Sequence, residues 1–178
     1  AYGEHTPAIK LLQMMQRGEG KLSPTHFHNS VHNTAGGYAS IATGNVAPST
    51  TLTGGGELVA SGLLEAWCLV ESSDQEVALI FADEPLQPPF DRDDIRSPLA
   101  LSLLLSPWPE RSLCALSGLG RAEIAPVPDS ERFGHLHVSA ALPLLEQIVE
   151  GRPGPIALAL ATGEPGPIRC VDLQITRS

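Results

Sequence analysis

The stretch that decides the fold runs from Ser49 to Val70 and reads STTLTGGGELVASGLLEAWCLV. Its Thr-rich beginning, Ser49–Thr53, favours a short extended strand. Gly54-Gly55-Gly56 then forms a sharp turn. Apolar residues surround nearly the whole helical circumference over Glu57–Val70, which is typical of a helix buried on most sides. The stretch therefore predicts a strand, a tight turn and a buried helix in succession.

Further helices and strands alternate around this unit. The predicted strands cover residues 77–82, 99–106, 113–124, 156–161 and 170–175. Helical spacing predicts helices over 7–16, 31–42 and 140–150, with a Pro24-bearing loop over 19–29. The small residues Gly36, Gly37 and Ala39 indicate that another segment approaches the second helix closely. This alternation predicts a layered α/β domain with a mixed sheet flanked by helices.

The chain has 178 residues, the size of one ordinary domain, so we take residues 1–178 as a single unit. It begins with Ala1 rather than Met, inside what reads as a Gly-containing turn, and we expect further residues upstream. Its cysteines number three, are widely spaced and follow no visible signal peptide. Such usage favours free thiols in a reducing compartment, so we expect a cytoplasmic location.

The charge distribution excludes some classes of partner. The formal net charge is −9, and no Lys or Arg occurs between residues 22 and 91. Nucleic-acid binding needs cations that neutralise phosphates, so we expect no nucleic acid here. No apolar run reaches the roughly 18 residues that a membrane-spanning helix needs, so we expect no membrane span either.

Several short motifs follow one another in an order and spacing typical of one family. They are SVHN at 30–33, SIATG at 40–44, PSTTL at 48–52, GLLEA at 62–66, ADEP at 82–85 and PFD at 89–91. The chain resembles the N-terminal half of a β-ketoacyl synthase, and more narrowly the short β-ketoacyl synthase-like N-terminal family. This resemblance implies a thiolase-like half-fold. It also implies a place in bacterial type II polyketide, fatty acid or aryl polyene biosynthesis, as a chain-length-factor type of subunit.

One departure from the family's active members bears on catalysis. Their nucleophilic cysteine lies in the turn before the long helix, and the matching position here is Gly56. Glycine has no side chain and cannot form an acyl-enzyme. The catalytic histidines of active synthases lie in the C-terminal half of that fold, which we expect to be absent from this chain. The resemblance therefore favours a non-catalytic subunit without cofactors over an enzyme, and leaves Glu57 as a weak candidate for residual acid or base chemistry.

The resemblance also implies an interface and partners. In the synthase fold the strand before the nucleophile turn pairs across a dimer axis, which places Thr50, Thr51, Leu52 and Thr53 at the interface. The expected partner is an active ketosynthase in a heterodimer, or a second copy in a homodimer. An acyl carrier protein is a further partner that the complex would bring in. Residues 22–91 offer it no cation, so the cations available for docking are those of the partner or Arg92, Arg96, Arg111 and Arg121.

Three histidines, His26, His28 and His32, form a local cluster before the second predicted helix. The cluster has no nearby Cys and includes a proline-bearing loop, so hydrogen bonding is favoured over a metal site. His28, His32 and Gly55 are the candidates for a pocket near the family's substrate tunnel. Glu57 at the start of a helix more often serves as a cap or dipole partner than as a catalytic group.

Two alternatives to the partner-subunit hypothesis stay open. One is a small acyl-thioester decarboxylase or hydrolase that uses the residual pocket at the family's nucleophile turn. The amides of Gly55 and Gly56 would stabilise an enolate there. The other is a homo-oligomeric binding or scaffold protein.

Overall fold

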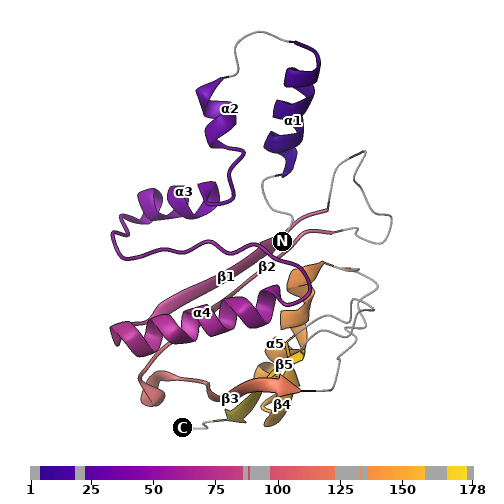
Figure 1. The fold of residues 1–178 in the computed structure, drawn as a ribbon. Helices are drawn as coiled ribbons and strands as arrows, with labels where there is room; N and C mark the ends of the chain where they lie inside the picture. Colours follow the sequence, from indigo (N-terminus) through magenta and orange to yellow (C-terminus); the bar gives the residue numbers. More distant parts are fainter. Residues whose placement is uncertain are drawn as a thin grey trace.

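The computed structural model describes residues 5–18, 23–85, 88, 97–122, 133, 136–158 and 168–175. Its helices are α1 (His5–Gln16), α2 (Pro24–His28), α3 (Thr34–Thr43), α4 (Leu58–Ser73) and α5 (Leu142–Glu150), with 3₁₀ turns η1 (Pro109–Arg111) and η2 (His137–Ala141). Its strands are β1 (Val77–Asp83), β2 (Leu99–Leu105), β3 (Cys114–Ala122), β4 (Gly154–Ala157) and β5 (Ile168–Ile175). Figure 1 shows α1, α2 and α3 at one end of the molecule and the strands with α4 and α5 at the other.

The strands form two small antiparallel sheets. β1 pairs with β2 from Val77 opposite Leu105 to Asp83 opposite Leu99. β5 lies between β3 and β4 in the second sheet, and the register of β3 shifts near Gly118, where the backbone has a positive φ of 63°. The alternation of helices and strands is as expected, but the expected mixed sheet is not seen within the described residues, where every pair is antiparallel. A parallel pair needs a crossover connection between its strands, whereas an antiparallel pair such as β1 and β2 does not.

The core lies where α4 packs on one face of the β1–β2 pair. Val59 and Leu63 of α4 meet Phe81 of β1, together with Leu136 before η2 and Leu144 of α5. Gly62 allows the close approach, because a Cβ atom there would lie 2.9 Å from Cε1 of Phe81. The aromatic ring thus occupies space that any other residue at position 62 would fill.

The outward face of α4 corrects the expectation of a helix buried on most sides. Leu64 and Cys68 are exposed, whereas Leu63, Ala66 and Val70 are buried. The opposite face of the small sheet is exposed as well, at Ile80 and at Leu104. Apolar residues around a whole helix allow it to be covered on all sides. Among the described residues, α4 is covered on the side of Leu63, Ala66 and Val70 and left exposed at Leu64 and Cys68.

The loop expected over residues 19–29 contains a helix instead. Pro24 lies at the first position of α2, where the missing N–H costs nothing because that donor has no partner within a helix. α1 begins at His5 and α3 at Thr34, close to the predicted helices, and Gly44 ends α3 in the left-handed conformation. Proline was interpreted as a breaker, although it equally favours the first turn of a helix.

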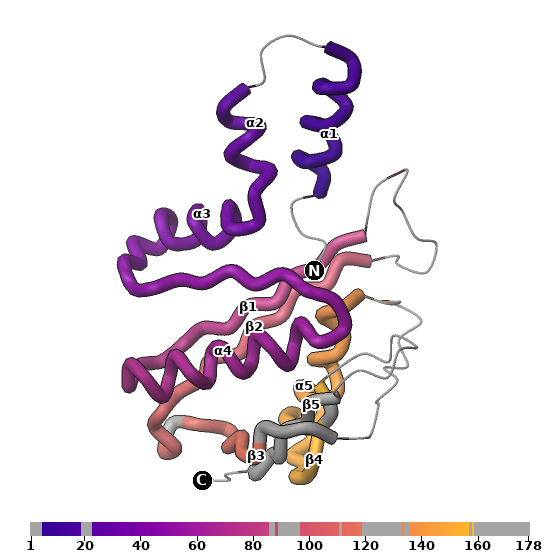
Figure 2. Tube along the Cα trace, viewed as in Figure 1, coloured from indigo at the N-terminus to yellow at the C-terminus, as the bar shows by residue number. Residues whose placement is uncertain are grey.

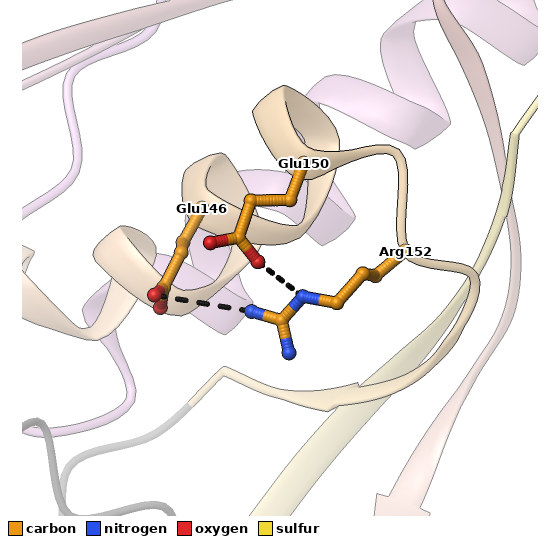
Figure 3. A network of polar contacts seen from close by, with 3 residues as sticks. All are labelled: Glu146, Glu150 and Arg152. Atoms are coloured by element: carbon orange, nitrogen blue, oxygen red, sulfur yellow. Dashed lines mark ion pairs between the residues drawn. The ribbon is translucent and has the colours of Figure 1, made fainter.

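The end of α5 is stabilised by its backbone. Gly151 adopts a left-handed φ of 64°, and the N–H of Arg152 donates to the carbonyl oxygen of Gln147 over 2.9 Å. The Arg152 guanidinium forms ion pairs with Glu146 and Glu150 (Figure 3). These side chains are exposed, so the ion pairs add little to the stability. Of the helices in the described ranges, none has the length and apolar character that a membrane crossing requires.

Candidate functional site

The turn at Gly54–Glu57, which we call the elbow, joins an extended segment to the start of α4. Gly54 and Gly55 are exposed, Gly56 is half-buried, and the N–H of Leu58 donates to the carbonyl oxygen of Gly55 over 3.0 Å. A Cβ atom at Gly55 would meet nothing within 4 Å. The turn therefore leaves open space beside Gly55, and its amides lie at the positive end of a helix of 16 residues.

Glu57 occupies the N-cap position of α4, not the first helical turn. Its backbone carbonyl accepts from the N–H of Ser61 over 2.9 Å, but its carboxylate makes no capping hydrogen bond. Its Oε1 atom is shielded from solvent and has no hydrogen-bond partner among the described residues. A shielded carboxylate oxygen without a hydrogen-bond partner can accept a proton or orient a hydroxyl. Residual acid or base chemistry at Glu57 stays a prediction.

The strand expected over Ser49–Thr53 does not form in the single chain. These residues have no strand pairing in the part of the chain that the structure describes, and all five are exposed. β-propensity requires a neighbouring strand before it becomes structure. Figure 2 shows the chain leaving α3, turning, and running back as an extended trace toward α4. Thr50, Thr51, Leu52 and Thr53 are therefore accessible, and their place in a dimer interface stays a prediction.

Large apolar side chains are exposed on the elements next to this extended segment. Ile41 of α3 is 80% exposed and Val46 is 99% exposed. Phe27 of α2 and Tyr38 of α3 are also exposed. No Asp, Glu, Lys or Arg occurs from residue 22 to residue 56. We call the exposed part of residues 23–55 the charge-free surface. Depletion of charged residues with exposed aromatic and aliphatic side chains is characteristic of the core of a protein–protein interface.

His28 and His32 lie within the charge-free surface. The His28 ring meets the Tyr38 ring edge-on at a centroid distance of 6.0 Å, and the Tyr38 hydroxyl donates to Oδ1 of Asn29 over 3.0 Å. Among the described residues no hydrogen bond or ring contact joins either histidine to the Gly54–Glu57 turn. The same residues contain no group of three or more His, Cys, Asp or Glu side chains arranged to hold a metal ion.

A second group of titratable residues joins α1 to β1. Burial lowers the pKa of His5, nearby His32 lowers this pKa further, and Asp83 and Glu84 act in the opposite direction. Asp83 is buried, and its Oδ1 accepts from the N–H of Glu84 over 3.2 Å. Sequence reasoning missed this group, because its members are far apart along the chain and no motif connects them.

Sequence reasoning also missed Phe27, Tyr38, Ile41 and Val46 as surface residues. The absence of lysine and arginine was noticed over residues 22–91, but the absence of acidic residues as well over 22–56 is the sharper signal. A stretch without charge of either sign that nevertheless lies on the surface would have indicated an interface.

Comparison with solved structures identifies the class of fold. The chain is similar to a ketosynthase, ApeO, in complex with its chain length factor, ApeC, from Xenorhabdus doucetiae, with a TM-score of 0.69 and 18% identity. The match covers 97% of this chain and 66% of that chain. The fold is thus thiolase-like, as the motifs imply, and this chain spans about two thirds of that neighbour's length.

The family follows from the sequence. The model of the β-ketoacyl synthase N-terminal domain matches residues 1–152, and the chain belongs to that family. No curated protein matches it.

Proposed function

We propose that this chain is a non-catalytic, chain-length-factor type subunit that pairs with an active ketosynthase in polyketide or fatty acid biosynthesis of the aryl polyene kind. The observation that carries the proposal is the charge-free surface, in which exposed apolar residues surround an extended segment without a strand partner. Strand addition to such a segment satisfies its backbone groups and covers apolar side chains at the same time.

The nucleophile position supports a non-catalytic role. Gly56 follows two further glycines at the elbow before α4, so no side chain in this triplet can attack a thioester. A subunit of this kind contributes surface, not reacting groups. In the pair, α4 and the charge-free surface would shape the space available to a chain that grows on the partner's cysteine.

The first test is co-expression with an active ketosynthase of the same organism, followed by size-exclusion chromatography with light scattering and by product-length analysis. We expect a heterodimer and a product-length distribution that changes when this chain is omitted. A chain that elutes as a monomer and leaves the products unchanged contradicts the proposal. A homodimer that binds no ketosynthase supports the scaffold alternative instead.

Matched charge substitutions locate the interface. Leu52→Asp places a charge within the charge-free surface, whereas Val149→Asp places the same charge on an exposed apolar residue of α5. A desolvated, unpaired carboxylate opposes association, so we expect Leu52→Asp to weaken pairing about tenfold or more. We expect Val149→Asp to pair as the wild type does. Equal effects of the two variants would place the interface elsewhere.

A second candidate function rests on Glu57. Its shielded Oε1 atom, which has no hydrogen-bond partner among the described residues, favours a residual decarboxylase or hydrolase acting on acyl thioesters. The measurement is turnover of malonyl and acyl thioesters by the wild type and by Glu57→Gln. Turnover that Glu57→Gln abolishes supports this function. Turnover that is absent in the wild type, or unchanged in the variant, removes it.

A further inference from the structure

The extended segment of the charge-free surface is held at its two ends by backbone contacts. At its start the N–H of Asn45 donates to the carbonyl oxygen of Ser40 over 2.9 Å, and the Asn45 side chain accepts from the N–H of Ala47. At its end the carbonyl oxygen of Gly55 accepts from the N–H of Leu58. Neither contact reaches the middle of the segment, where the proposed interface residues lie.

The middle of the segment lies against α3 at Gly36. A Cβ atom at Gly36 would be 3.2 Å from Oγ1 of Thr51 and 3.7 Å from Oγ of Ser49. At the neighbouring Gly37 a Cβ atom would meet nothing within 4 Å. Sequence reasoning expected a close approach at both glycines, and it occurs only at Gly36.

The two contacting side chains are separated by two positions. In an extended chain alternate side chains point to the same side, so Ser49 and Thr51 turn toward α3 while Thr50 and Leu52 turn away from it. The distance between the extended segment and α3 therefore determines how far the side chains of Thr50 and Leu52 project from the surface. A methyl group at position 36 would lie 3.2 Å from Oγ1 of Thr51, so Thr51 would have to shift by a few tenths of an ångström to admit it.

We propose that Gly36 is a positioning residue for partner binding. Because Gly36 has no side chain, Ser49 and Thr51 can pack closely on α3. This packing sets how far Thr50 and Leu52 project toward the ketosynthase. This inference rests on the proposed function, since it assigns a positioning residue to the same interface. A glycine inside a helix lowers the stability relative to alanine. The close packing of the segment on α3 explains why position 36 is nevertheless a glycine.

The test compares Gly36→Ala with Gly37→Ala, measuring affinity for the active ketosynthase and the thermal unfolding midpoint. Both variants exchange a helical glycine for a better helix former, so neither midpoint should fall. We expect Gly36→Ala to pair about tenfold more weakly than the wild type. Gly37→Ala, whose methyl group would meet no atom within 4 Å, should pair more tightly than Gly36→Ala by at least about threefold. A Gly36→Ala variant that pairs as tightly as Gly37→Ala overturns the inference.

A rescue variant separates positioning from general damage. Thr51→Ala removes the hydroxyl that the new methyl group would meet, so the Gly36→Ala change should weaken pairing less than about threefold in the Thr51→Ala background. If Gly36→Ala fails to fold, recovery of folding and pairing in the double variant supports the contact, and failure of both contradicts it. Should neither the wild type nor Gly37→Ala bind the ketosynthase, the proposed function itself is wrong.

Discussion

The described residues of 5–55, which we call the arm, and those of 58–158, which we call the body, use apolar side chains in opposite ways. In the arm only Leu11 and Thr34 are buried among the described residues. In the body, residues such as Leu63, Leu136 and Leu144 form one continuous core. Figure 1 shows α1 and α2 of the arm at a distance from α4 and the strands, and the segment after α3 running back toward α4. The body is stabilised by its own packing, whereas the arm exposes apolar surface, which the proposed partner would cover.

The largest expected difference between the two regions is in stability. Leu63 is 1% exposed, and Leu63→Ala should lower the free energy of unfolding by about 2–5 kcal/mol through lost burial and the cavity left behind. The control is Val46→Ala in the arm, where the side chain is already in water and the change should stay within about 0.5 kcal/mol. Urea unfolding of both variants measures the contrast. Similar losses would mean that the arm has a core of its own.

A smaller effect comes from glycines in the two regions. Gly62→Ala in the body forces its methyl group against the ring of Phe81, which is buried and cannot move aside. Overpacking costs about 1–3 kcal/mol, and the gain in helix propensity offsets about 1 kcal/mol of it. Gly37→Ala in the arm has open space and should raise the stability instead. Chemical denaturation measures the free energy of unfolding of both variants. A Gly62→Ala variant more stable than the wild type would contradict the close packing of α4 on β1.

Thiol chemistry sharpens the distinction between exposed and packed surfaces within the body. Cys68 is exposed on the outward face of α4, whereas burial raises the pKa of the half-buried Cys114. Only the thiolate reacts with disulfide reagents, so Cys68 should be labelled faster than Cys114 near neutral pH. Mass spectrometry of peptides taken during the labelling gives both rates. Faster labelling of Cys114 would contradict the burial described here.

The comparison also explains what could be predicted from the sequence. α4, β1 and β2 lie close to their predicted bounds, because long apolar runs with clear ends carry strong local signals. The family was recognisable from short motifs in a typical order, and the turn at Gly54–Gly56 from its three consecutive glycines. The close approach at Gly36 was indicated by its small size, although the contacting residues, Ser49 and Thr51, could not be named in advance.

The failures share a physical cause, which is that they depend on contacts far apart in sequence or outside the chain. The segment Ser49–Thr53 has strand composition, but its pairing depends on a neighbouring strand, and none of the strands that the structure describes pairs with it. Composition likewise cannot tell whether Leu64 on α4 is covered by the same chain or left exposed. The group around His5 and Asp83 forms only when α1 meets the end of β1.

The smallest expected effect tests the junction of arm and body through pH. Burial holds the pKa of His5 below its ordinary value of 6.5, with His32 adding to this and Asp83 and Glu84 opposing it. The unfolded chain therefore takes up the proton more readily than the folded chain as the pH falls below 6.5. His5 contributes no pH slope well above that value, and the free energy of unfolding falls as the pH drops through the lowered pKa. Unfolding measured across this range should show a shallower slope for His5→Gln than for the wild type. An identical slope would mean that His5 is solvated, and that α1 does not pack at the end of β1.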